Sequence, residues 1–423
     1  MKVRVNAQNL ADILNAACKS KLRQDCLFEA LQDRLTVHAS DGANYFQISV
    51  SAAVEETGKL VVFAPMLVQL LKSVGPREVT IFPHHNMTRL VVQLGDEAQY
   101  LLPLGFRQDE EEDDDPLRAR ATELMNEAAP VIAFKSLNAW QDCSNSVKPY
   151  RGEWEFSNIW VVPLRQQPEW AMAQVVAAAI ATDQTILAAS LLTAHQPEIL
   201  TDKEIVLFVP PELTALPIRS FALASKEEKS YIYAILDDGF VCAPTDMQNS
   251  GHYHRVVNNL LFTPAHAQLR FDRATWQHLK KAIQTYAEKK VSRYNRSAIA
   301  RWDILPDGSH YIWSSTEQSI LFTAEKAEVI GEIPRPSTFW TILLEKAIKF
   351  VPTPSVIELI LQENACMMRL HDQSNYRICV LMSMVFGSDY ESFTGSSKQE
   401  TQNSPVTPET EEEETEVDEY VEV

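Results

Sequence analysis

The sequence predicts an α+β protein of three similar domains, each with helices on one face of curved antiparallel sheets. Three observations support this prediction. Many short stretches alternate apolar and polar residues, amphipathic helical stretches lie between them, and one helix-and-strand pattern occurs three times. Alternating strands turn one face of a sheet toward water, so the helices are expected to cover the other face.

The repeated pattern sets the expected domain organisation. Its unit is an apolar strand, a proline, a helix and further strands, and the copies begin at Leu60, Glu204 and Val329. Proline suits a first helical turn, because the N–H that it lacks has no partner there. Pro217 is expected to end the helix of the second copy early. The expected segments are three domains and an acidic tail, at 1–125, 126–262, 263–390 and 391–423.

A second helix-and-strand unit precedes each copy, so every domain is expected to have two halves. In the first domain, residues 10–18 carry an apolar stripe at helical spacing, and two strands follow at 35–40 and 45–50. A helix within 134–145 begins the second domain in the same way. The third begins with a helix around Trp276, followed by strands that turn at Asp307–Gly308.

Composition limits the compartment and the partners. The chain has no apolar run long enough to cross a membrane and no secretion signal, and its six cysteines lack metal-ligand or disulfide-framework spacing. We therefore expect a cytoplasmic protein. The formal charge of -19 argues against a nucleic-acid partner, but it is concentrated at 109–115 and after Gly395, so the remaining body is close to neutral.

Basic residues are expected on the outward faces of several helices and in the adjoining loops. Lys19 stands opposite the apolar stripe of the first helix, and Lys349 repeats that spacing in the third domain. One outward lysine is typical of any soluble helix. Together, however, they predict a surface that attracts phosphates without discriminating bases. The candidate DNA-binding residues are Lys19, Lys21, Arg23, Lys72, Lys148, Arg151, Lys281 and Lys349.

The sequence gives little indication of an enzyme. It has no Gly-rich phosphate loop, no GxSxG and no HExxH, and it nominates no catalytic residue. The histidines at 84–85 and 252–254 have no Cys, Asp or Glu at ligand spacing. We expect neither a metal nor a cofactor.

Five stretches resemble the bacterial DNA sliding clamp, the β subunit of DNA polymerase III. Two lie in the first domain, at 35–50 and 58–74. In the second, Thr182, Asp183 and Leu187 match a Thr-Asp-Gly-His-Arg-Leu motif, with Gln184 at its glycine. Residues 251–256 resemble Pro-Asp-Tyr-Arg-Arg-Val, and residues 380–384 resemble Val-Val-Met-Pro-Met. The resemblance extends to about Phe386, and the chain is identified as a divergent member.

The resemblance implies a head-to-tail homodimer that encircles double-stranded DNA, with a polymerase and a clamp loader as partners. In the family, partners insert a short peptide between the second and third domains. The corresponding pocket here would consist of Phe156, Thr182, Leu187, Arg255, Val256, Val380, Met382 and Met384. The segment 318–322 resembles such a peptide, but its alternating pattern predicts a strand.

Two other interpretations stay open. The replaced Gly-His-Arg residues, the acidic run and the acidic tail also fit a monomeric interaction or regulatory module with the clamp fold that does not encircle DNA. An unrelated β-rich binding protein would require the threefold pattern to be accidental. Oligomeric state separates the first two, because an open monomer has no topological link to DNA.

Overall fold

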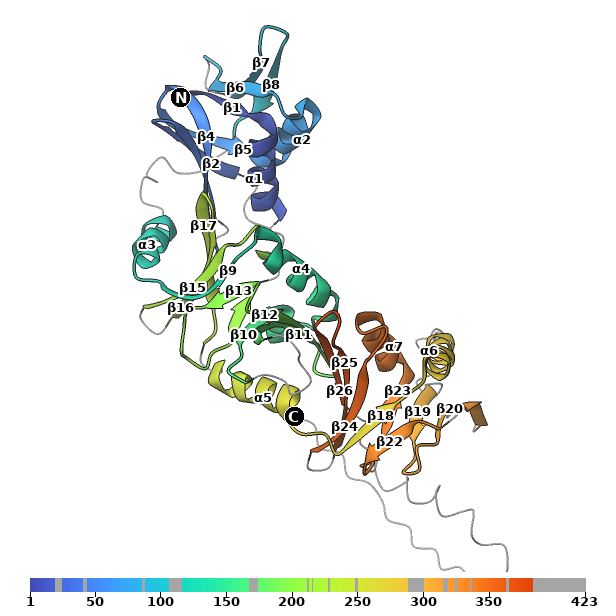
Figure 1. Cartoon of the computed structure of the whole chain (residues 1–423). Coiled ribbons are helices and arrows are strands. Elements are labelled where there is room, and N and C mark those ends of the chain that lie inside the picture. Colours follow the sequence, from blue (N-terminus) through green and yellow to red (C-terminus); the bar gives the residue numbers. More distant parts are fainter. Residues whose placement is uncertain are drawn as a thin grey trace, which may run out of the picture. The chain divides into compact units, whose positions relative to one another are not determined.

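The computed structural model describes residues 1–382 except 20–24, 41–43, 86–87, 106–115, 167–173, 211–212, 215, 227–228, 248–249, 288–299, 315–318, 324–325, 335–336 and 363–364. Its strands form antiparallel sheets of thirteen, nine and four strands, and seven α-helices pack on them (Figure 1). The predicted α+β class is confirmed. No helix in these described ranges is long and apolar enough to span a membrane.

The same succession of elements occurs three times. The first repeat contains β1 (Lys2–Asn6), α1 (Ala7–Lys19), β2 (Asp25–Leu31), β3 (Arg34–Ser40), β4 (Tyr45–Glu56), β5 (Gly58–Phe63), α2 (Ala64–Val74), β6 (Glu78–Pro83), β7 (Arg89–Leu94) and β8 (Ala98–Pro103). Helix α3 (Pro116–Met125) follows it.

Within the described residues, the second repeat has no second α-helix. Residues 213–214 are in a 3-10 turn, residues 211–212 and 215 lie outside the described residues, and no helix continues through Pro217, as expected. The repeat contains β9 (Ala129–Phe134), α4 (Leu137–Val147), two 3-10 turns (Lys148–Tyr150 and Trp154–Ser157), β10 (Ile159–Pro163), β11 (Val175–Thr182), β12 (Ile186–Thr193), β13 (Pro197–Ile199), β14 (Leu207–Val209), β15 (Ser220–Lys226), β16 (Lys229–Leu236) and β17 (Gly239–Thr245). Helix α5 (Ser250–Phe262) follows it.

The third repeat restores both helices. It contains β18 (Ala267–Arg270), α6 (Arg273–Ala287), β19 (Ala300–Ile304), β20 (His310–Ser314), β21 (Ser319–Thr323), β22 (Glu328–Gly331), β23 (Thr338–Trp340), α7 (Thr341–Phe350), β24 (Val356–Gln362), β25 (Ala365–Asp372) and β26 (Arg377–Met382). Residues 319–322 of the segment that resembles a partner peptide lie in strand β21, as predicted, and Gln318 lies outside the described residues.

The helices divide between two faces of the sheets. Helices α1, α2, α4, α6 and α7 all contribute to one continuous core, as the apolar stripes predicted. Along β11, Ala177 and Ala179 face this core, whereas Ala178 and Ile180 face a separate cluster on the opposite side. The sequence did not predict α3 and α5. They cover parts of that opposite side, which we had expected to face water.

Two strand pairings join the repeats. At the first junction β4 pairs with β17, and Tyr45 lies opposite Cys242. At the second junction β12 pairs with β26, and Leu187 lies opposite Val380. In both cases the fourth strand of one repeat meets the last strand of the next repeat along the chain. The sheets therefore continue across both junctions.

Candidate partner and DNA surfaces

On the side of the second junction that faces away from the main core, helix α5 covers an apolar cluster of strand residues. We call it the second-junction cluster. Val257 and Leu261, on one side of α5, are buried in it, and the half-buried Tyr253 packs against it. The other buried residues of the cluster lie in or beside strands: Trp160, Val162, Leu164, Val175, Ala178, Ile180, Leu187, Ala189, Leu191, Val206, Phe208, Ile360, Met367, Ile378 and Val380.

Four aromatic rings pack together in and against this cluster. The Trp160 ring lies 4.9 Å from Tyr253, 5.7 Å from Phe208 and 6.1 Å from Phe156, measured between ring centroids. Phe156 and Tyr253 are partly exposed, whereas Trp160 is 3% exposed. Within the described residues, the Trp160 Nε1–H has no hydrogen-bond acceptor. A buried donor without an acceptor costs on the order of 1–3 kcal/mol.

The structure brings several of the predicted pocket residues together. Leu187 and Val380 are strand partners in the cluster, but they are only 6% and 3% exposed. Thr182 is buried at the end of β11. The remaining residues differ in position: Phe156 is half-buried beside Trp160, Arg255 is exposed and Val256 half-buried on α5, Met382 lies in β26 with an undescribed side chain, and Met384 lies outside the described residues.

The turn after β11 shows how the motif around Asp183 works. Asp183 Oδ1 accepts hydrogen bonds from the backbone N–H groups of Thr185, at 3.0 Å, and Ile186, at 2.9 Å. Its Oδ2 lies 3.2 Å from Lys346 Nζ on α7, so the turn is tied to the third repeat. Burial acts to raise the pKa of Asp183, but these hydrogen bonds hold it below its usual value.

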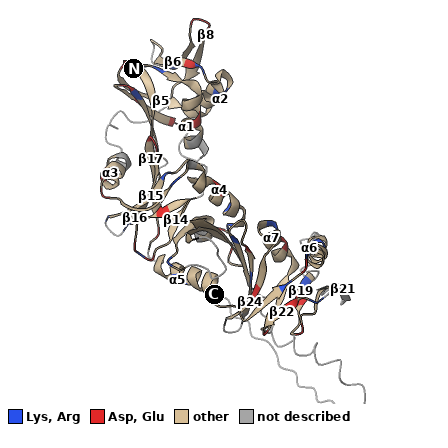
Figure 2. Ribbon diagram, in the orientation of Figure 1, with Lys and Arg blue, Asp and Glu red and all other residues tan. Residues whose placement is uncertain are grey.

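The basic residues proposed to bind DNA differ in their exposure and in the partners that they already have. Lys72 and Lys281 are exposed on α2 and α6, and Lys72 Nζ donates to Asn15 Oδ1 at 2.9 Å. Lys349 is exposed on α7 but forms an ion pair with Glu345, at 2.5 Å between Nζ and Oε1. Lys and Arg are blue in Figure 2, which shows that they are spread over many elements.

Two other candidates have structural partners. Lys148 Nζ donates to Thr214 Oγ1 at 3.2 Å. Arg151 donates to the carbonyl oxygens of Lys148 and Ser157. Lys19 ends α1 with an undescribed side chain, and Lys21 and Arg23 lie outside the described residues. A role in DNA binding stays a prediction for all eight.

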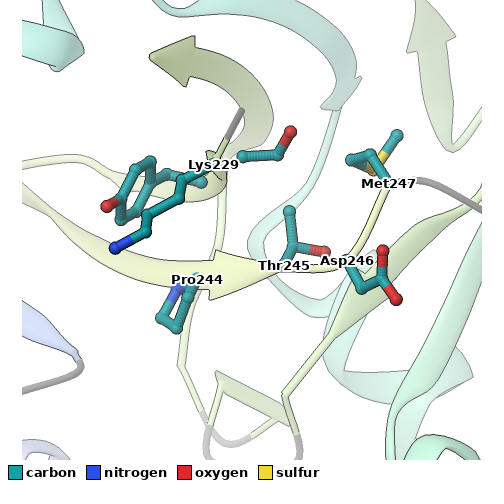
Figure 3. A pocket seen from close by; sticks show the side chains of 7 residues that line it. Lys229, Pro244, Thr245, Asp246 and Met247 are labelled. Carbon is teal, nitrogen blue, oxygen red and sulfur yellow. The ribbon is translucent and has the colours of Figure 1, made fainter. Parts of the chain in front are cut away.

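The described residues offer little for catalysis or metal binding. No group of three or more His, Cys, Asp or Glu side chains within them could hold a metal ion. A recess of about 560 Å³ lies where β16 begins and β17 ends. Figure 3 shows Lys229 and Pro244 on one side of it and Asp246 and Met247 on the other. One lysine and one aspartate in an open recess do not indicate a particular reaction.

Comparison with solved structures identifies the fold. A DNA polymerase sliding clamp from Pseudomonas aeruginosa superposes with a TM-score of 0.63 and 16% sequence identity, over 91% of this chain and 100% of the clamp. The β subunit of DNA polymerase from Streptococcus pyogenes gives 0.60 and 12%, again over 91% of this chain and 100% of that one. This chain has the sliding-clamp fold. The DNA polymerase III β subunit of Thermotoga maritima gives 0.59 and 13%, with the same coverage.

Sequence comparison adds no closer relative of this clamp-fold chain. No protein-family model matches it, and no curated protein does. The structural likeness nevertheless covers all three repeats, so the resemblance in a few short motifs reflects a shared fold. At identities of 12–16%, the likeness shows the fold alone. The activity of this chain therefore has to be argued from its own surface residues.

Proposed function

We propose that this protein is a DNA sliding clamp, a non-catalytic processivity factor that closes head-to-tail as a homodimer around duplex DNA. The observation that carries the proposal is the strand pairing between repeats. The fourth strand of one repeat pairs with the last strand of the next at both junctions. The corresponding strands left at the ends of the chain are β21 and β8, each the last strand of its sheet among the described residues.

Strand β21 of one copy of the chain would pair with strand β8 of a second copy in the register of the two observed junctions. At the first junction the first residue of β4 opposes the fourth residue of β17, and at the second the first residue of β12 opposes the fifth of β26. The same register would place Ser319 of one subunit opposite Leu101 or Leu102 of its partner. Tyr100 and Leu101 are 38% and 48% exposed on β8. Burying them would stabilise such an interface.

A closed ring retains DNA by topology, so its contacts with phosphates are free to be weak and screened by salt. A polymerase tethered to the ring stays at a high effective concentration near the primer end. The second-junction cluster is the proposed site for the tether, because it presents the aromatic residues Phe156 and Tyr253 beside the exposed Arg255. A partner peptide that enters beside these rings would also offer an acceptor to Trp160 Nε1–H.

Ring closure is tested with a cysteine pair. The variant Leu101→Cys/Ser319→Cys should form a covalent dimer under mild oxidation, and light scattering should give twice the chain mass of 47.8 kDa. The pair Leu31→Cys/Ser319→Cys is the matched control, because Leu31 is equally exposed on β2. A ring that is loaded onto nicked circular DNA and then oxidised should stay on that DNA at high salt and leave when the DNA is linearised. A monomer at all concentrations would rule out the ring and favour the interaction module.

The peptide site is tested separately, with a labelled Gln-Ser-Ile-Leu-Phe peptide. The variant Trp160→Phe removes the unpartnered donor but keeps an aromatic ring, so peptide affinity should fall several-fold while stability is kept or improved. Tyr253→Ala should weaken binding further. The exposed Leu31→Ala is the control and should bind the peptide normally. Unchanged affinity in both cluster variants would show that the peptide does not bind at this surface. The ring proposal would be unaffected.

A further inference from the structure

The third repeat contains a recess of about 460 Å³ that the proposed function does not use. It lies between the end of β18, the first turns of α6 and the segment that leads into β24. Its lining is mainly apolar and aromatic, with Phe271, Trp276 and Val356 among its side chains. Arg270 and Arg273 also line it, and both are exposed. The recess therefore combines apolar side chains with two exposed cations.

The walls of this recess are fixed by contacts within the protein. Trp276 Nε1–H donates to the Pro352 carbonyl at 3.2 Å, and Lys280 Nζ donates to the same oxygen at 3.4 Å. The backbone N–H of Ser355 donates to the His371 carbonyl at 2.7 Å. Phe271 packs edge-on against the His310 ring, with centroids 5.2 Å apart. A ligand would thus enter a preformed site and would order few side chains on binding.

The two arginines have no partner of their own in the described part of the chain. Neither Arg270 nor Arg273 forms an ion pair or a side-chain hydrogen bond there. The neighbouring Asp272 forms no ion pair with either arginine in the described part of the chain; its Oδ1 accepts from the N–H groups of Ala274, at 2.8 Å, and Thr275, at 2.9 Å, at the start of α6. Guanidinium groups bind carboxylates in a two-pronged geometry.

Glu328 is another acid near Arg270. It lies opposite Arg270 in the register of β18 and β22, yet it makes no ion pair with it. In a chain of formal charge -19, two unpaired arginines beside an apolar recess are suited to a ligand that brings its own carboxylates.

We propose that this recess is a docking site for an acidic peptide of a partner protein, distinct from the second-junction cluster. One bulky apolar side chain of the peptide would pack against Phe271 and Trp276, and carboxylates on either side would pair with Arg270 and Arg273. Duplex DNA is less well matched, because a phosphate backbone supplies the negative charge but no side chain for the apolar wall.

The test uses the full chain and a labelled peptide, Glu-Asp-Phe-Asp-Leu-Glu, with affinity measured by fluorescence anisotropy. Arg273→Glu and Arg270→Glu should each weaken binding at least tenfold. Both side chains are exposed, so the fold should be kept, and thermal unfolding checks this. Arg89→Glu, an equally exposed arginine on β7, is the control for net charge and should leave affinity unchanged.

A second variant tests the apolar wall independently of charge. Val356→Trp should fill the recess and remove peptide binding, while binding of the Gln-Ser-Ile-Leu-Phe peptide at the second-junction cluster and dimer formation remain normal. Three results would overturn the proposal: no binding at millimolar peptide, binding that survives Arg273→Glu or Val356→Trp, or arginine variants that weaken duplex DNA binding in place of peptide binding. None of these results bears on ring closure.

Discussion

Arg369 donates hydrogen bonds from Nε and Nη2 to Oε2 of Glu358, on the neighbouring strand, and the Nε bond is 2.7 Å long. Its Nη1 and Nη2 also donate to the carbonyl oxygens of Leu260, Leu261 and Thr263, at 2.8–3.0 Å. One buried side chain therefore ties strands β24 and β25 to the last turn of α5. A cation is favourable there, because the carbonyls at a helix C-terminus carry partial negative charge.

Removing this guanidinium should be costly. Arg369→Met would leave the buried Glu358 carboxylate and three carbonyls short of donors, so the free energy of unfolding should fall by about 3–5 kcal/mol. Urea denaturation measures the change. Adding Glu358→Gln should recover part of the loss, since no unpaired charge then remains. Arg377→Met, which removes one long hydrogen bond of 3.4 Å to the Phe350 carbonyl, is the matched control. Equal decreases in Arg369→Met and Arg377→Met would contradict the account.

The buried group formed by Arg369, Glu358 and His371 also predicts that acid destabilises the fold. His371 Nε2 lies 2.7 Å from Glu358 Oε2. Burial lowers the pKa of His371 below 6.5, although Glu358 opposes this and Arg369 adds to it. Burial acts to raise the pKa of Glu358, but His371 and Arg369 hold it down at about 2. Both groups therefore bind fewer protons folded than unfolded, so acid favours unfolding.

The expected stability falls in two stages. It should decrease as the pH drops below 6.5 because of His371, and again from about 4.5 toward 2 because of Glu358. Urea midpoints measured between pH 7.5 and 3 provide the test. His371→Gln should flatten the first stage and also reduce the second, because His371 helps to hold the pKa of Glu358 down. A midpoint that does not change between pH 6.5 and 4.5 in the unmodified chain would contradict the His371 assignment.

The position of Arg369 and His371 in β25 also shows what strand periodicity cannot predict. Residues 367–372 alternate, and the pattern correctly predicts strand β25, with Met368 and Leu370 toward the helix-side core. Alternation places Arg369 and His371 on the other face, where we expected water. Helix α5 covers that face instead, so both side chains are buried. Strand periodicity gives the two faces but cannot show that a distant helix covers the second.

Some of what was missed had a local signal. Tyr253, Val257 and Leu261 recur every four residues, which is typical of a helix. Helix α3 is short and contributes only a few small side chains to its cluster, including Ala121 and Leu124. The strand pairings across the junctions had no such signal, because their registers join residues at least 187 positions apart.

The turn at Gln184 predicts a stabilising substitution. Gln184 has a positive φ of 76°, at the position where the clamp motif has glycine. A left-handed backbone costs a residue with a Cβ about 1–2 kcal/mol, and the exposed Gln184 side chain makes no buried contact that would offset this. Gln184→Gly should therefore raise the free energy of unfolding by about 1 kcal/mol, measured by urea denaturation. Gln184→Ala keeps the strain and serves as the control. A loss of stability in Gln184→Gly would show that the turn is not strained.

The helix lysines predict how DNA binding responds to salt. Removing one lysine that neutralises a phosphate should reduce the slope of log affinity against log salt by about 0.9, with no change in sequence preference. Lys281→Ala should show the full effect, because Lys281 is exposed on α6. Lys349→Ala should show less, since Lys349 is already paired with Glu345. Lys229→Ala, an exposed lysine on β16, is the control. Binding of a short linear duplex across a salt series measures these slopes. Slopes that stay the same in the combined Lys72→Ala/Lys281→Ala/Lys349→Ala variant would show that DNA does not bind along these helices.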